Sequence, residues 1–180
     1  MTIAAEDRET LLSLARRAVE DTVNGMYPSA PENASGILLE TRGCFVTLTN
    51  AGKLRGCMGT FQPDSPLGEM IVKIGSLSAR DPRFTDNPIT PGELGELDLE
   101  VSVLSPLEKT DDPAGLTIGQ HGIYIVSGGR SGCFLPEVAT DQGWNVEEFL
   151  GFCCAHKAGL PADAWRNPST EVFLFTSEKF

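Results

Sequence analysis

The spacing of apolar residues changes repeatedly along this chain, and that change constrains the fold more than any other feature. Residues 6–25 place apolar side chains at helical spacing, with acidic residues in the first turn and Gly25 where a helix can end. Residues 43–61 read as a hairpin, and residues 94–104 alternate between apolar and polar side chains with a period of two, which is typical of a strand. Helices and strands are interleaved without regular strand–helix–strand alternation. We therefore expect an α+β fold with a mixed or antiparallel sheet and flanking helices.

A second helix is predicted over residues 65–81, with Ser65 as its N-cap and Pro66 at the first helical position. It should stop near Asp81, because Pro82 disfavours a helical conformation in the residue before it. The segment "NAGK" reads as the connection of the hairpin over residues 43–61.

The C-terminal part of the chain predicts two strands around the turn "SGGRSG", a helix and a closing strand. The helix begins with a capping-box pattern at Asn145 and Glu148 and ends near Gly159. Its spacing places Cys153 and His156 on the packing face, with Cys154 at the periphery. The closing strand, "TEVFLFT", has consecutive apolar residues and should be buried on both faces.

Composition excludes several classes of protein. The formal net charge of -11 and the lack of a Lys/Arg cluster make nucleic-acid binding unlikely. No apolar run is long enough to cross a membrane, and the N-terminus lacks signal-peptide features, so we expect a cytoplasmic protein. The five cysteines are an odd number without a CxxC pair, and there are two histidines, so neither a disulfide framework nor a metal site is expected. No cofactor is indicated.

The segment "LRGCMGTF", residues 54–61, is the first candidate site. Cys57 is either a reactive thiol, activated by Arg55 and nearby backbone N–H groups, or a small apolar residue of the core. In a regular strand Arg55 and Cys57 share a face. Alternatively, backbone N–H groups around Gly56 and Gly59 form an anion-binding nest, although tight turning explains these glycines equally well.

Three further candidates come from other segments. Arg80 and Arg83 in "SARDPRF" either clamp an anion or stabilise a helix C-terminus, with a local Asp81–Arg83 pair. Glu100 is an acid or base if its side of the strand lines a cleft, and a surface carboxylate if it does not. His121 suits proton transfer or a structural hydrogen bond at a strand end. Cys57, His121 and Glu100 have the residue types of an activated-thiol arrangement.

These segments resemble a known family. "LRGCMGTF" is similar to the signature LRGCIGT of the AMMECR family, with Met58 in place of isoleucine. Further blocks resemble the family in the same order: "SARDPRF", "LEVSVLSP", "HGIYIVSGGRSGCFLPEVA" and "KAGLPADAW". The resemblance implies one domain over residues 1–180, built of two intertwined lobes with a cleft between them. We expect residues 1–62 with 118–180 to form the larger lobe and residues 63–117 the smaller.

The resemblance carries no established reaction. It implies partners, because prokaryotic relatives tend to occur with Memo-like and radical-SAM proteins. Our leading hypothesis is a small enzyme or enzyme subunit whose cleft is lined by Arg55, Cys57, Arg80, Glu100 and His121. Cys57 would be the nucleophile or redox thiol, His121 or Glu100 the proton-transfer group, and the arginines would hold a small anionic substrate. The alternative is a noncatalytic module that binds a small anion or a peptide and works with those partners.

Overall fold

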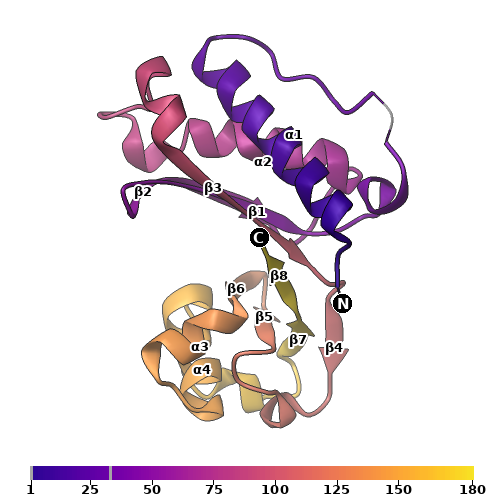
Figure 1. Cartoon of the computed structure of the whole chain (residues 1–180). Helices are drawn as coiled ribbons and strands as arrows, with labels where there is room; N and C mark the ends of the chain where they lie inside the picture. The colour runs from indigo at the N-terminus through magenta and orange to yellow at the C-terminus, as the bar shows by residue number, and fades with distance from the viewer. Residues whose placement is uncertain (1, 33) are drawn as a thin grey trace. The chain divides into compact units, whose positions relative to one another are not determined.

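The computed structural model describes residues 2–32 and 34–180 and divides into two compact units (Figure 1). The first unit runs up to Leu104 and also contains Glu178–Phe180, and the second is Ser105–Ser177. Each unit contains one four-stranded sheet and its own apolar core. The α+β class predicted from the changing periodicity is confirmed.

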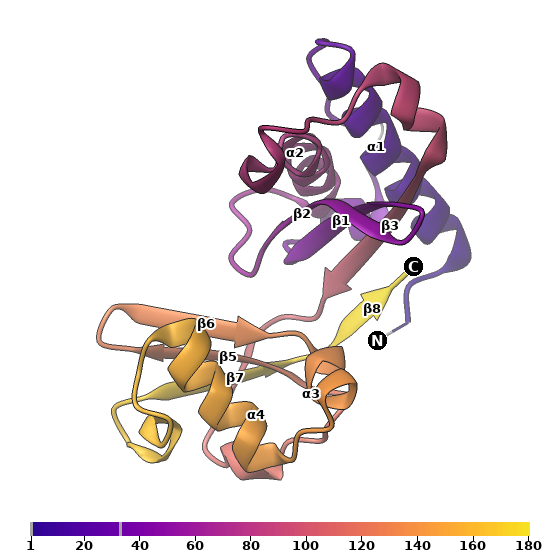
Figure 2. The same ribbon diagram turned by 90° about the vertical axis from the view of Figure 1, so that its left-hand side faces the viewer.

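In the first unit, the sheet has the strand order β2-β1-β3-β8. Strand β1 (Cys44–Asn50) pairs antiparallel with both β2 (Lys53–Thr60) and β3 (Leu97–Leu104), while β8 (Ser177–Lys179) lies beyond β3. Helices α1 (Ala5–Val23) and α2 (Leu67–Ala79) pack against each other and on one face of this sheet (Figures 1 and 2). That face supplies the buried side chains of β1, which are Cys44, Val46 and Leu48.

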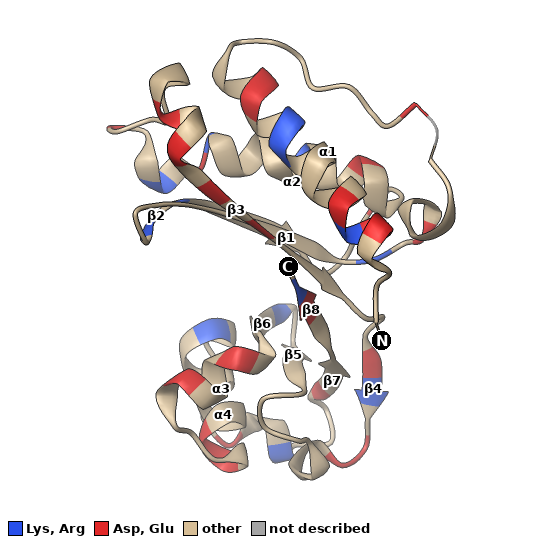
Figure 3. Cartoon of the chain, viewed as in Figure 1, with Lys and Arg blue, Asp and Glu red and all other residues tan. Residues whose placement is uncertain are grey.

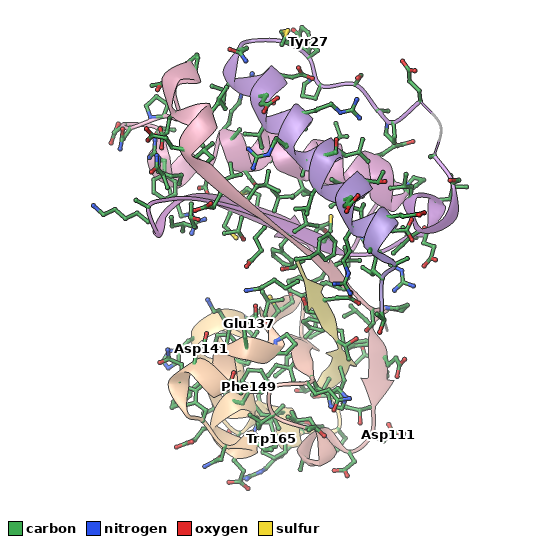
Figure 4. The ribbon with its side chains drawn as sticks, viewed as in Figure 1. Tyr27, Asp111, Glu137, Asp141, Phe149 and Trp165 are labelled. Atoms are coloured by element: carbon green, nitrogen blue, oxygen red, sulfur yellow. The ribbon has the colours of Figure 1, made fainter. Side chains whose placement is uncertain are left out.

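In the second unit, the strand order is β4-β7-β5-β6, with antiparallel pairing throughout. These strands are β4 (Glu108–Thr110), β5 (Gly122–Ser127), β6 (Arg130–Phe134) and β7 (Glu171–Phe175). Helix α3 (Pro136–Gln142) contacts β5, and α4 (Val146–Phe152) continues into a π-helical segment, Cys153–Ala158, that packs on β6 and β5. The buried core is centred on Ile123, Ile125 and Phe149, the last of which is labelled in Figure 4.

Short 3-10 helices make most of the remaining connections. They span Gly36–Leu39, Pro82–Phe84, Pro91–Glu96, Pro113–Gly115 and Ala164–Arg166. None of the described helices is both long enough and apolar enough to cross a membrane.

Both predicted hairpins are confirmed, and their turns have the same geometry. Ala51 and Gly52 connect β1 to β2 with φ values of 46° and 74°. Gly128 and Gly129 connect β5 to β6 with φ values of 56° and 78°. Two consecutive residues with positive φ match the right-handed twist of the flanking strands.

The start of α2 differs from our prediction. Pro66 is the N-cap, with an extended ψ of 151°, and the helix begins one residue later at Leu67. The Leu67 N–H donates to the carbonyl of Glu40 at 2.8 Å, so a distant backbone group takes the place of the Ser65 cap. The end of α2 is confirmed, because the helix stops at Ala79 and Asp81 is extended before Pro82. Helix α3 was not predicted, because its seven residues are too few to show a periodicity.

The capping box at Asn145 and Glu148 is confirmed, but two predictions further along this helix are wrong. Cys154 is fully buried rather than peripheral, and His156 is exposed rather than packed. The cause is the π-helical geometry of Cys153–Ala158, which adds a residue to the turn and rotates the following side chains. His156 instead stacks on the ring of Phe152, with centroids 5.5 Å apart.

The closing strand is confirmed as β7, although it is less buried than predicted. Val172 and Phe175 are buried, whereas Phe173 and Leu174 are half-buried. The compact units also differ from the predicted lobes. Residues 63–104 belong with the residues before them, because α2 packs on β1 and β3 pairs with β1.

Candidate functional site

Strand β2 carries the LRGC segment at one edge of the first unit's sheet, and side chains from α2 and the residues after it cover that edge. The N–H of Cys57 donates to Asp81 Oδ2 at 2.9 Å, and the N–H of Met58 donates to Ser78 Oγ at 3.1 Å. Arg83 Nη2 donates to the carbonyl oxygen of Cys57 at 3.0 Å. The "LRGCMGTF" and "SARDPRF" segments therefore bind each other. These contacts protect the edge strand from pairing with another chain.

Asp81 is the centre of this arrangement. Its side chain is 1% exposed and accepts hydrogen bonds from the backbone N–H groups of Cys57 and Arg83 and from the Arg83 guanidinium. The pKa of Asp81 is held well below its usual range, first by the side-chain hydrogen bonds from Arg83 and then by the two backbone donors, against the opposing effect of burial. The local Asp81–Arg83 pair is confirmed, and it also anchors β2.

Gly56 and Gly59 have packing roles in β2. A Cβ on Gly56 would lie 2.0 Å from the carbonyl oxygen of Ser78, so the absence of a side chain lets β2 approach the end of α2. A Cβ on Gly59 would lie 2.0 Å from the ring of Phe45. Neither glycine has a positive φ, and the N–H groups of Cys57 and Met58 already have acceptors. Close approach, rather than an anion-binding nest, accounts for both positions.

A β-bulge at Arg55 interrupts the regular pairing of β2 two residues before Cys57. The register shifts between Leu48 and Thr49, which leaves Arg55 without a partner in β1. Its guanidinium binds Glu93 through Nε at 2.5 Å and Nη2 at 2.9 Å, and Nη1 donates to the carbonyl of Asn87 at 3.1 Å. The expectation that Arg55 and Cys57 share a face required a regular strand, and β2 is not regular there.

The Arg55–Glu93 pair is partly buried and bidentate, and in this geometry each charge stabilises the charged form of the other. Hydrogen bonding to Glu93 raises the pKa of Arg55, and hydrogen bonding to Arg55 lowers the pKa of Glu93. The Glu93 carboxylate therefore already occupies the anion-binding side of the Arg55 guanidinium.

The thiol of Cys57 lies on the other face of the sheet, where α1 and α2 do not pack. Thr47 is its partner in β1, and the Thr47 hydroxyl donates to Cys57 Sγ at 3.4 Å. Thr47 also pairs with Glu100 of β3, so the three side chains form one row on the same face. Glu100 is two strands from Cys57, about 10 Å. Its carboxylate pairs with Lys179 at 3.2 Å.

The other four cysteines have pKa values raised by burial. Burial raises the pKa of Cys44 to about 12, and it raises the pKa of Cys133, Cys153 and Cys154 as well. All five cysteines are free thiols. A thiol reacts as its thiolate, so these four should react slowly near neutral pH.

Arg80 lines a pocket of about 210 Å³ in the first unit, together with Arg55, Ala79, Asp81, Phe84, Thr85, Pro88 and Ile89. Its Nη2 lies 3.5 Å from the carbonyl oxygen of Thr22, near the end of α1. Within residues 2–32 and 34–180, no carboxylate forms an ion pair with Arg80. It is therefore the arginine in this region most available to an anion.

His121 belongs to the second unit, where it closes a turn. Its Nδ1 accepts from the N–H of Thr117 at 3.0 Å, and its own N–H donates to the Thr117 carbonyl at 3.0 Å. This is the structural alternative that the sequence left open. Its part in a Cys57–His121–Glu100 arrangement stays a prediction. Among the described residues, no group of three or more His, Cys, Asp and Glu side chains is placed to hold a metal ion.

Sequence reasoning missed four residues that shape this region: Thr47, Ser78, Asp81 as an anchor, and Glu93. Asp81 had a detectable signal, since it precedes a proline and lies between two arginines. Thr47 and Ser78 had none, because their roles depend on strand register and on how α2 packs against β2.

Comparison with known proteins places this arrangement in a family. The family model AMMECR1 matches residues 12–180. The chain belongs to the AMMECR1 family. The predicted resemblance is confirmed, and every candidate residue named above lies within the matched range.

AMMECR1-family relatives match along nearly their whole length. A protein of Methanothermobacter thermautotrophicus is 37% identical, over 99% of this chain and 95% of its own. A protein of Thermococcus gammatolerans is 42% identical, over 96% of this chain and 88% of its own. The crystal structure of PH0010 from Pyrococcus horikoshii matches with a TM-score of 0.86 and 39% identity, over 98% and 92% of the two chains. PH0010 is itself described as uncharacterized.

Proposed function

We propose that this protein is a small enzyme, or an enzyme subunit, that uses the Cys57 thiol on a small anionic substrate. The observation that carries the proposal is the way in which Cys57 is held. Its backbone N–H and carbonyl are bound by Asp81 and Arg83, and its sulfur accepts from Thr47, while the residue itself stays partly exposed. A nucleophile needs this combination of fixed position and access.

The surrounding charges suit an anionic substrate. The Arg83 side chain is 56% exposed and reaches the Cys57 carbonyl, so its remaining donors can bind a carboxylate or phosphate beside the thiol. In the proposed reaction, a base takes the thiol proton and sulfur bonds to an electrophilic carbon of the substrate. The leaving group departs with the proton returned by that base, and water then releases the acyl group from sulfur. Glu100, which lies on the same face of the sheet as Cys57, is the candidate base within the first unit.

Cys57 should be the most reactive of the five thiols. In the folded protein at pH 8, we expect iodoacetamide to modify Cys57 at least about tenfold faster than any other cysteine, because the other four are buried or have raised pKa values. Mass spectrometry of peptides from a time course measures all five rates at once. Repeating it from pH 6 to pH 9 gives the apparent pKa of each thiol.

The matched variant is Thr47→Val, which removes the hydroxyl next to the sulfur and keeps the side-chain shape. If the hydroxyl stabilises the thiolate, this variant should slow modification of Cys57 and leave the other four rates unchanged. A Cys57 that is no faster than Cys133 in the folded wild type would contradict the proposal.

A noncatalytic anion-binding module is the second candidate, and Arg80 is the observation that favours it. Arg80 faces a pocket of about 210 Å³ without an ion-pair partner among the described residues, whereas Arg55 and Arg83 both have carboxylates. A module of this kind would need Arg80 and tolerate Cys57→Ser. An enzyme of the kind proposed would lose its activity with Cys57→Ser while keeping its fold.

Phosphate binding tests this second candidate. We expect Arg80→Ala to weaken binding of inorganic phosphate at least about tenfold in calorimetry, because the variant removes the unpaired cation. Lys53→Ala removes an exposed positive charge from the hairpin end of β2 and serves as the control. Equal affinities of the Arg80→Ala and Lys53→Ala variants would exclude a phosphate site at Arg80.

Complexes with Memo-like or radical-SAM proteins form part of the same proposal, on the basis of family association. Co-purification of the tagged chain with each candidate, compared with an unrelated acidic protein of similar size, tests each pairing separately. In either complex, the partner would supply the substrate of Cys57 or consume its product.

A further inference from the structure

A pocket in the second unit lies outside the candidate site described above. It has a volume of about 340 Å³ and is formed where α4 faces the 3-10 turn Ala164–Arg166. Its lining residues are Glu147, Glu148, Gly151, Phe152, Ala162, Asp163, Trp165 and Arg166. A Cβ on Gly151 would lie 3.3 Å from the carbonyl oxygen of Ala162, so the two walls meet closely at this point. The volume lies within the range of small-molecule sites.

The lining combines aromatic rings with negative charge. Trp165, labelled in Figure 4, and Phe152 are half-buried, so part of each ring is accessible. The pocket contains three carboxylates, from Glu147, Glu148 and Asp163, against one cation from Arg166. The faces of aromatic rings attract cations, and the surplus of carboxylates adds to that attraction.

Arg166 already makes a cation–π contact of this kind with Trp165. The Arg166 guanidinium lies 4.5 Å from the centroid of Trp165 and donates to Glu147 at 2.7 Å. Both partners of this ion pair are largely exposed, at 54% for Arg166 and 71% for Glu147. Exposed pairs of this kind contribute little and exchange readily with solvent. A cation in solution can therefore take the place of Arg166 on the indole ring.

The second unit as a whole carries a net negative charge, as the pocket does. Residues 105–177 contain nine acidic and four basic residues, and Figure 3 shows acidic residues on α3 and α4. A field of one sign over a concave, partly apolar surface concentrates counterions there. Asp163 adds a carboxylate for which no cationic partner is found among the described residues.

We propose that this pocket binds an alkylammonium group. The ammonium would lie over Trp165 and within reach of the Glu147 and Asp163 carboxylates, and the alkyl chain would pack on Phe152. The group can come from a free primary amine or from a lysine side chain of a basic peptide, since both present the same chemistry. This site shares no residue with the Cys57 site and does not depend on the function proposed for it.

The first test uses n-butylammonium chloride as the probe and the two tryptophan indole N–H signals in NMR as the readout. The Trp165→Phe variant assigns the signals, and sodium chloride keeps the ionic strength constant. We expect a saturable shift of the Trp165 signal with a dissociation constant in the millimolar range, and a much smaller shift of the Trp144 signal. The neutral analogue 1-butanol should give no saturable shift.

Variants of the pocket give a pattern that a nonspecific charge effect would not produce. Asp163→Asn should weaken butylammonium binding at least threefold, whereas Asp141→Asn on α3, outside the pocket, should leave it unchanged. Arg166→Ala should strengthen binding, because it removes the competing internal cation. Circular dichroism checks that each variant is folded.

Two results would overturn the proposal: a 1-butanol shift equal to that of butylammonium, or equal effects of Asp163→Asn and Asp141→Asn. Weaker binding by a folded Arg166→Ala variant would overturn it as well. A capped trilysine peptide then identifies the source of the group. Tighter binding of the peptide than of butylammonium supports a lysine on a partner, and equal or weaker binding supports a free amine.

Discussion

Replacing Gly56 by alanine should lower the free energy of unfolding of the first unit by about 3 kcal/mol or more. The new Cβ would lie 2.0 Å from the Ser78 carbonyl oxygen and 3.0 Å from its carbonyl carbon. These are backbone atoms at the end of α2, so no side-chain rotation relieves the overlap. Strand β2 and α2 would have to separate, which also weakens the hydrogen bonds from Cys57 and Met58 to Asp81 and Ser78.

Hydrogen exchange of the Val46 and Leu48 amides measures this effect within the first unit, since both residues are buried in β1. Gly92→Ala is the matched control, because a Cβ there meets no atom within 4 Å. We expect that control to change stability by no more than about 0.5 kcal/mol. Exchange in Gly56→Ala equal to that in Gly92→Ala would show that β2 does not approach α2 as described.

Asp81→Asn should have the second largest effect, with a loss of about 2–4 kcal/mol at pH 7. The buried carboxylate accepts from two backbone N–H groups and from the Arg83 guanidinium, and an amide in its place loses the charge that strengthens these bonds. We expect this loss of stability to come from the weaker acceptor at position 81. An unpaired Arg83 costs little, because its side chain is half exposed and can be solvated. Urea unfolding followed by circular dichroism gives the difference.

The pH dependence of this difference has a definite sign. The folded pKa of Asp81 lies below that of an unfolded aspartate, about 3.9, so its contribution is complete above that value. As the pH falls below about 4 towards the folded pKa, the contribution is lost and wild type and variant should converge. Asp64→Asn removes an exposed carboxylate whose pKa is also lowered by its hydrogen bond from Lys73, and it should show a much smaller difference at all of these pH values, because solvent screens the exposed pair. A wild-type advantage that grows below pH 4 would contradict the assignment to Asp81.

The hairpin turns, the amphipathic helices and the capping box could be predicted because each depends on residues close together in the sequence. Ala51 and Gly52 or Gly128 and Gly129 define a tight turn whatever surrounds them. Asn145 and Glu148 cap each other three residues apart. The predictions failed where local spacing changed without a local signal, as at the π-helical segment that buries Cys154 and exposes His156.

The candidate site was predictable in its residues but not in its contacts. Cys57, Arg55 and the "SARDPRF" segment are all found where the chain builds a connected region of the first unit. Arg55, however, binds Glu93, which is 38 residues away, and the bulge that directs it there has no signature in the segment itself. The positions of His121 and Glu100 in any reaction stay predictions.

The sequence by itself determined the α+β class, the family, most elements and the residue types from which a thiol or anion site could be made. Local periodicity, turn residues and caps specify these features, since they act over a few positions along the chain. Only the tertiary structure decided that Gly56 serves close packing and that Asp81 anchors Cys57 across 24 residues. It also decided that Thr47 lies beside the sulfur. These contacts join elements far apart in the chain, and packing and strand register, which set them, are properties of the folded whole.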